Sequence, residues 1–180
     1  MTVDASAWRA AVLDHLMTAG GPACRHAAHY IRAHDVQIRF ARQSTGARWT
    51  LRGDIELNEP AFCLQSNPTD PRLLGLVVHE ATHLEQGIGL ALSVAGEVRG
   101  WQAEFAARAE LNAPIPAIHW RTIAQLPDPP TDADLRLARA GMLRMAGYRY
   151  LIWLLPLRPN WWTRLAERLG ARLFRGRRRA

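Results

Sequence analysis

The chain has 180 residues, of which 48% are hydrophobic and 22% charged, and it carries a net charge of +7. This composition excludes wholesale disorder and a polytopic membrane protein, and the length suits one domain with an appendage. The two cysteines form no CxxC pair, and the N-terminus lacks the features of a secretory signal, so we expect a cytoplasmic protein.

The first third of the chain predicts two helices followed by a small sheet. Residues 5–18 and 22–34 have helical patterns and are separated by two glycines. Apolar residues then recur with a period of two in residues 36–40, 47–51 and 54–58, with turn signals between them. We expect these strands to form a three-stranded antiparallel meander, which gives an α+β fold.

Helices are predicted for most of the remaining chain. Asp70 and Pro71 suit the start of a helix that reaches Gly87, and Ser93 suits the N-cap of a second helix that ends near Leu111. Residues 112–131 contain five prolines and predict an extended crossing segment. Further helices are predicted over residues 132–146, 148–155 and 161–174. We therefore divide the chain into a domain of residues 1–157, with a metal core at 47–111 and C-terminal helices at 132–157, and a tail of residues 158–180.

The motif HEATH begins at residue 79, directly after an apolar run that predicts a buried helix. His79 and His83 are four residues apart, so on a helix they lie on one face and can direct both imidazoles at one metal ion. Glu80 lies about 100° around the helix, from where it can reach a bound water. Because buried polar groups are costly unless they are paired or bind a metal, the motif predicts a zinc site rather than two surface histidines.

The second predicted helix offers Glu97 and Glu104 as the third ligand, and both lie on the same face. If the two helices form an antiparallel hairpin with a bend near Ile88, Glu97 lies about 13 Å from the bend, level with the histidines, and Glu104 about 24 Å away. We therefore predict that Glu97 is the ligand and keep Glu104 as the alternative, or as a supporting or surface residue. Gly100 would let the helices approach closely.

Three stretches of the chain resemble the active-site core of gluzincin-type zinc metallopeptidases, in particular their compact versions. These stretches are DIELN, LLGLVVHEATHLEQG and SVAGEVRGWQAEF. The resemblance covers about residues 47–111 and implies a mainly helical zincin-like fold in which the HExxH helix packs on a glutamate helix. It also implies that a peptide substrate adds to the edge of the DIELN strand. One turn after the ligand glutamate, where many members of the family have an acidic residue, this chain has Trp101. The zinc ligands implied are His79, His83 and Glu97.

The resemblance implies metal-assisted peptide hydrolysis, in which Glu80 takes a proton from the attacking water and returns it to the leaving amine. Residue type alone makes His119, Tyr148 and Tyr150 candidates for stabilising the oxyanion. His26 and His29 have no ligand partner near them in the sequence, so we interpret them as structural or exposed.

The tail contains eight arginines and one acidic residue, and thus holds the whole net charge of +7. In a helix, Trp161, Trp162, Leu165, Leu169 and Leu173 would lie on one side, with arginines on the other. Such a helix suits an anionic membrane, which would place the protein at the inner membrane face, and it suits packing on its own domain equally well. We favour lipid over nucleic acid as an external partner.

Three functions fit these observations. The first is a zinc-dependent peptidase. The second is a non-catalytic zinc protein whose basic tail contacts a membrane or nucleic acid. The third is a bacterial regulatory module that senses or cleaves one partner protein. Glu80 favours the first and third, because a purely structural site does not need a general base.

Overall fold

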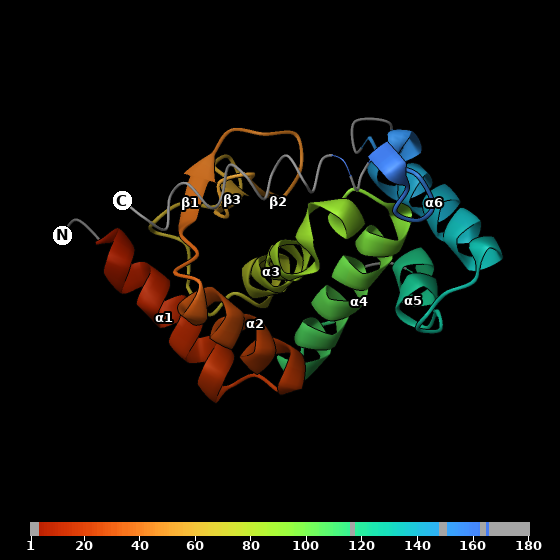
Figure 1. The fold of residues 1–180 in the computed structure, drawn as a ribbon. Coiled ribbons are helices and arrows are strands. Elements are labelled where there is room, and N and C mark those ends of the chain that lie inside the picture. The colour runs from red at the N-terminus through yellow and green to blue at the C-terminus, as the bar shows by residue number, and fades with distance from the viewer. Residues whose placement is uncertain (1–3, 116–117, 148–150, 163–164, 166–180) are drawn as a thin grey trace.

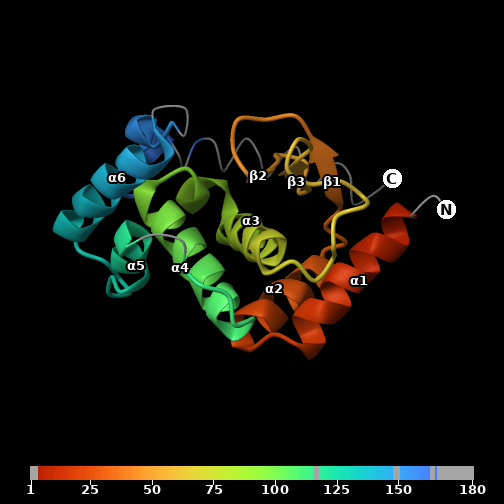
Figure 2. The ribbon, with the colours of Figure 1, turned by 180° about the vertical axis from the view of Figure 1, so that it is seen from behind.

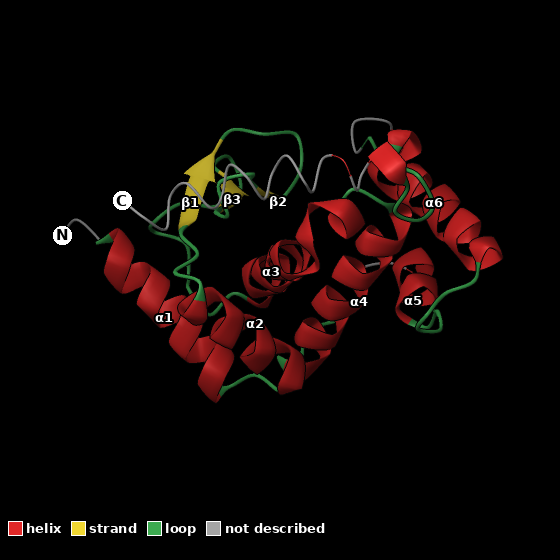
Figure 3. Ribbon diagram, viewed as in Figure 1, coloured by secondary structure: helices red, strands yellow, loops and turns green. Residues whose placement is uncertain are grey.

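The computed structural model describes residues 4–115, 118–147, 151–162 and 165. Its helices and small sheet confirm the mixed α+β class (Figures 1 and 3). The helices are α1 (Ala5–Thr18), α2 (Pro22–Ala33), α3 (Pro71–Ala91), α4 (Val94–Glu110), α5 (Ile118–Ala124), α6 (Asp132–Ala146) and the 3-10 turn η2 (Ile152–Leu154). The strands are β1 (Ile38–Ala41), β2 (Ala47–Trp49) and β3 (Ile55–Asn58).

Helix α3 lies at the centre of the molecule. The sheet covers one side of α3, α2 covers another with α1 packed on α2, and α4 separates α3 from the pair α5 and α6, as opposite views show (Figures 1 and 2). Two apolar clusters follow from this arrangement. The first joins α1, α2, the sheet and the first half of α3. The second joins α4, α5, α6 and η2.

The order of the strands differs from the predicted antiparallel meander. Within the described residues the sheet order is β1-β3-β2, with β3 parallel to β1 and antiparallel to β2. The predicted antiparallel sheet is therefore wrong for the β1–β3 pair. The prediction that the DIELN strand forms an edge is also wrong, because β3 is paired on both sides and β1 and β2 form the edges.

The starts of the two central helices follow the predicted capping residues. The Asp70 side chain accepts a hydrogen bond from the Arg72 backbone, and the Ser93 side chain accepts one from the Gly96 backbone. Gly87 has φ 74° and ψ 162°, so it breaks α3 between its long first part and a final turn. A glycine suits this position because other residues rarely adopt such backbone angles.

Two predictions for the C-terminal half need correction. The segment 112–131 is not extended throughout, because it contains α5. The helix predicted over 148–155 is only the turn η2 within its described part, and most of the helix predicted over 161–174 falls outside the described residues. In the part of the chain that the structure describes, no helix combines the length and the apolar character needed to cross a membrane.

Candidate metal site

The candidate site lies where α3 and α4 pack against each other in opposite directions. Gly75, near the start of α3, lies close to Arg108, near the end of α4. A Cβ atom on Gly75 would lie 3.0 Å from Arg108 Nε. Near the other end of the helix pair, the Gln86 side chain donates a hydrogen bond to the Gly96 carbonyl. The start of α3 therefore lies beside the end of α4, and the later part of α3 lies beside the start of α4. The two helices form the antiparallel hairpin that was assumed from the sequence.

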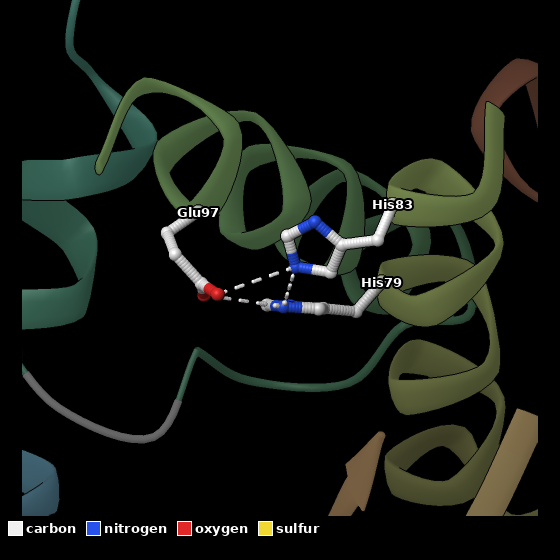
Figure 4. A group of neighbouring side chains, drawn as sticks. All are labelled: His79, His83 and Glu97. Atoms are coloured by element: carbon white, nitrogen blue, oxygen red, sulfur yellow. Dashed lines mark hydrogen bonds and ion pairs between the residues drawn. The ribbon is translucent and has the colours of Figure 1, made fainter. Parts of the chain in front are cut away.

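This packing brings His79 and His83 of α3 together with Glu97 of α4 (Figure 4). The two Nε2 atoms are 3.0 Å apart. Glu97 Oε2 lies 3.7 Å from His79 Nε2, and Glu97 Oε1 lies 3.6 Å from His83 Nε2. Both histidines are buried and Glu97 is nearly so. Two imidazole nitrogens and one carboxylate oxygen therefore converge on one point, as a metal site requires.

Gly100 makes the close approach of the two helices possible. A Cβ atom at this position would lie 2.9 Å from His79 Nε2 and 3.1 Å from His83 Nε2. The first distance is too short for real carbon contacts, and the second is tighter than usual. The missing side chain thus leaves the metal-facing nitrogens uncovered, which fits the role predicted for Gly100.

Glu104 lies behind His79 and is completely buried. Its Oε2 atom is 3.2 Å from His79 Nδ1, and its Oε1 atom accepts a hydrogen bond from the Arg108 guanidinium. A hydrogen on Nδ1 that is donated to this carboxylate leaves the Nε2 lone pair directed at Glu97 and His83. The edge-to-face contact of Trp101, with ring centroids 5.0 Å apart, further restricts the imidazole. Glu104 therefore holds the His79 imidazole from behind, on the side away from Glu97.

The carboxylates determine the protonation of this cluster when no metal is bound. Burial disfavours the charged form of His79, but hydrogen bonds to Glu104 and Glu97 outweigh burial and raise its pKa to about 10. Burial also disfavours the Glu97 carboxylate, yet the charges of His83 and His79 hold its pKa well below the usual value. A proton therefore occupies the lone pair that a metal ion would use, and proton and metal compete for it.

Glu80 is buried beside the cluster and does not join it. Burial raises the pKa of Glu80, against the lowering effect of His79 and His83. A hydrogen bond from the Trp49 backbone also lowers this pKa. The Trp49 ring lies against His83, with centroids 6.4 Å apart. A carboxylate with a raised pKa is a better proton acceptor near neutral pH, as a general base requires.

The two histidines differ in how they are held. His79 Nδ1 faces Glu104, whereas His83 Nδ1 is buried and has no hydrogen-bond partner among the described residues. Sequence reasoning did not find the contacts of Trp49 and Arg108. Trp49 lies in no recognisable motif. The contact of Arg108 is with Glu104, four residues before it on the same helix, so it could be predicted only once the position of Glu104 was known.

The remaining candidates lie elsewhere. His26 forms an exposed ion pair with Glu85, at 2.8 Å, and His29 is exposed, so neither belongs to the cluster. Of the residues proposed for the oxyanion, His119 lies on α5 but its side chain is not described, and Tyr148 and Tyr150 lie outside the described residues.

No protein-family model, no curated protein and no solved structure matches the chain. The assignment therefore depends on the geometry of the cluster itself. His79, His83 and Glu97 form a largely buried group that could hold a metal ion.

Proposed function

We propose that the protein is a zinc-dependent metallopeptidase with a zincin-like core, as the resemblance of residues 47–111 implies. His79, His83 and Glu97 would hold the ion, and three protein ligands of nitrogen and oxygen are typical of catalytic zinc. A bound zinc ion would supply Lewis acidity and lower the pKa of the attacking water to about 7. The observation that carries the proposal is the buried Glu80 beside this three-residue cluster.

The residues around the cluster support distinct steps of hydrolysis. Glu80 would take the proton of the attacking water and deliver it to the leaving amine, and burial favours this by raising its pKa. Glu104 would keep His79 oriented, with its proton on Nδ1.

Strand β2 is the part of the sheet best placed to bind an extended peptide. It forms an edge of the sheet, and its last residue, Trp49, contacts both Glu80 and His83. Addition of a peptide to this edge would bring a backbone carbonyl toward the cluster. The resemblance assigns this role to the DIELN strand, but β3 is central, so we assign it to β2 instead.

Glu80→Gln tests the proposal. We expect wild-type protein to cleave a mixture of unstructured peptides, to lose activity with a chelator and to regain it with zinc. The Glu80→Gln protein should keep its zinc, measured by elemental analysis, but cleave at least about 100-fold more slowly. Glu85→Gln, which changes an exposed carboxylate on the same helix, is the matched control and should remain active. Zinc-loaded wild-type protein that cleaves no peptide would instead support the non-catalytic alternative.

A further inference from the structure

Large apolar side chains are exposed over residues 151–165, at the C-terminal end of the described chain. Trp161 and Trp162 stack on each other, with ring centroids 3.6 Å apart, and both remain about as exposed as Leu154 of η2. Exposed apolar groups concentrated in one short segment indicate an interaction surface. We call this set the 151–165 surface, and its exposed side chains, each between 41% and 62% accessible, are Leu151, Trp153, Leu154, Trp161, Trp162 and Leu165.

The segment that carries this surface is firmly attached to the domain. The carbonyls of Pro156 and Leu157 accept hydrogen bonds from the backbones of Val94 and Ala95, at 2.9 and 3.0 Å. These are the first N–H groups of α4, which have no partner inside the helix. Ile152 is fully buried in the second apolar cluster. Leu151, Trp153 and Leu154 therefore belong to an anchored segment, and Trp161 begins four residues after its last anchored carbonyl, so binding a partner would cost little ordering of the first half of the surface.

Further contacts hold the segment to α6 and to the residues just before it. Arg158 donates hydrogen bonds to the Asp132 side chain and to the Pro130 carbonyl, and Arg139 donates one to the Leu155 carbonyl. Packing of the tail's apolar side on its own domain was the alternative predicted from the sequence. Three of the five residues of that side are described, and all three are exposed: Trp161, Trp162 and Leu165. Leu169 and Leu173 lie outside the described residues.

The charge of the neighbouring sequence indicates which partner fits. Residues 158–180 carry a net charge of +7, and the rest of the chain is neutral. Tryptophan favours the headgroup region of a bilayer, leucine the acyl boundary, and arginine the lipid phosphates. We propose that the 151–165 surface docks on an anionic lipid bilayer. Nucleic acid would match the arginines but not the leucines, and a second copy would match the leucines but bring together two tails of equal charge.

Docking would also position the candidate metal site. The anchoring hydrogen bonds reach the first turn of α4, which is the turn that carries Glu97. The segment that carries the 151–165 surface is therefore hydrogen-bonded to the turn that carries Glu97. The docking proposal does not depend on peptidase activity, because it concerns binding alone.

The test is co-flotation of the full chain with vesicles. We expect binding to vesicles of phosphatidylcholine with phosphatidylglycerol, and at least about tenfold weaker binding to phosphatidylcholine alone. Leu154→Ala should weaken binding about tenfold, and Trp161→Ala with Trp162→Ala more strongly. Leu51→Ala is the matched control, because Leu51 is equally exposed, at 58% against 59% for Leu154, but lies in the turn between β2 and β3. It should leave binding unchanged.

Several outcomes would overturn the docking proposal. One is equal binding to both kinds of vesicle, and another is equal loss in the Leu51 and Leu154 variants. Binding to duplex DNA that the leucine and tryptophan variants retain, without binding to vesicles, would assign the tail to nucleic acid. A dimer in light scattering that the same variants dissociate, again without vesicle binding, would assign the surface to a second copy. Glu80→Gln should bind vesicles as wild type does, which separates this test from that of the peptidase proposal.

Discussion

Glu104 Oε2 lies 3.2 Å from His79 Nδ1, although the two residues are 25 positions apart in the chain. The contact links a fully buried carboxylate on α4 to an imidazole of the HExxH motif on α3. It fixes which nitrogen of His79 faces Glu97. The metal site therefore depends on a residue that is not itself a ligand.

Replacing Glu104 by Gln should weaken zinc binding without abolishing it. The amide keeps the shape of the side chain but loses the charge that favours the proton on Nδ1, so we expect about 10- to 100-fold lower affinity at unchanged stoichiometry. Competition with a fluorescent chelator measures this. Glu85→Gln should bind zinc as wild type does, and equal affinity in the Glu104 and Glu85 variants would show that the contact does not tune the site.

Glu97→Ala should remove stoichiometric zinc. It deletes the only carboxylate of the three-residue group and leaves two histidines of one helix, which is half of a tetrahedral site. Elemental analysis after dialysis, beside the Glu80→Gln protein that should keep its metal, provides the comparison. One zinc ion per chain in the Glu97→Ala protein would remove Glu97 from the ligand set.

Gly100→Ala should weaken metal binding by occupying space between the two histidines and α4. The added methyl group would lie 2.9 Å from His79 Nε2, so the imidazoles must move apart or the helices must separate. We expect weaker zinc binding and a loss of about 1–3 kcal/mol in the free energy of unfolding. Gly141→Ala in α6 is the control, because its Cβ would meet nothing within 4 Å. That variant should be about 0.5–1 kcal/mol more stable, and similar chemical denaturation curves for the two variants would contradict the prediction.

The stability of the metal-free protein should fall as pH rises. The pKa of His79 is raised from 6.5 to about 10, so its stabilisation is complete below pH 6.5 and disappears as pH approaches 10. The pKa of Glu97 is lowered, so its contribution is present above pH 4.5 and is lost only in stronger acid. Melting temperatures measured with a chelator from pH 6.5 to 10 should therefore decline. The zinc-loaded protein should lack this decline, since the metal replaces the proton, and parallel curves would refute the explanation.

The parts of the fold that were predictable from sequence depend on local signals. Asp70 with Pro71 and Ser93 mark helix starts through contacts within one turn. The position of Glu97 followed from the helical rise, once the glycines at 87 and 89 indicated a bend. Helix α5 was missed because its segment is rich in proline. The prolines at 114, 116, 127, 129 and 130 all lie outside Ile118–Ala124, so the helix itself contains none.

Strand order depends on contacts that no local pattern encodes. Residues Ile38 to Ala41 pair directly with Ile55 to Asn58 in parallel, although β2 lies between them in the sequence. Alternating apolar residues reveal only that strands exist. The same limit applies to Glu104. Its burial against His79 and Arg108 requires the register between two helices, which the sequence constrained only through an assumed hairpin.

The two apolar clusters meet along α3 and α4, and the three residues of the candidate metal site lie beside both clusters. The histidines share α3 with Leu74 and Val78 of the first cluster, while Glu97 lies between Ala95 and Val98 of the second. Helix α4 already contributes Ala107 to the first cluster, and an ion bound here would add a further link between the two clusters and so strengthen the coupling of their melting. Differential scanning calorimetry should give one sharp transition with zinc and a broader or divided one after chelation. Loss of the ion would then reduce the cooperativity of folding as well as the proposed peptide hydrolysis.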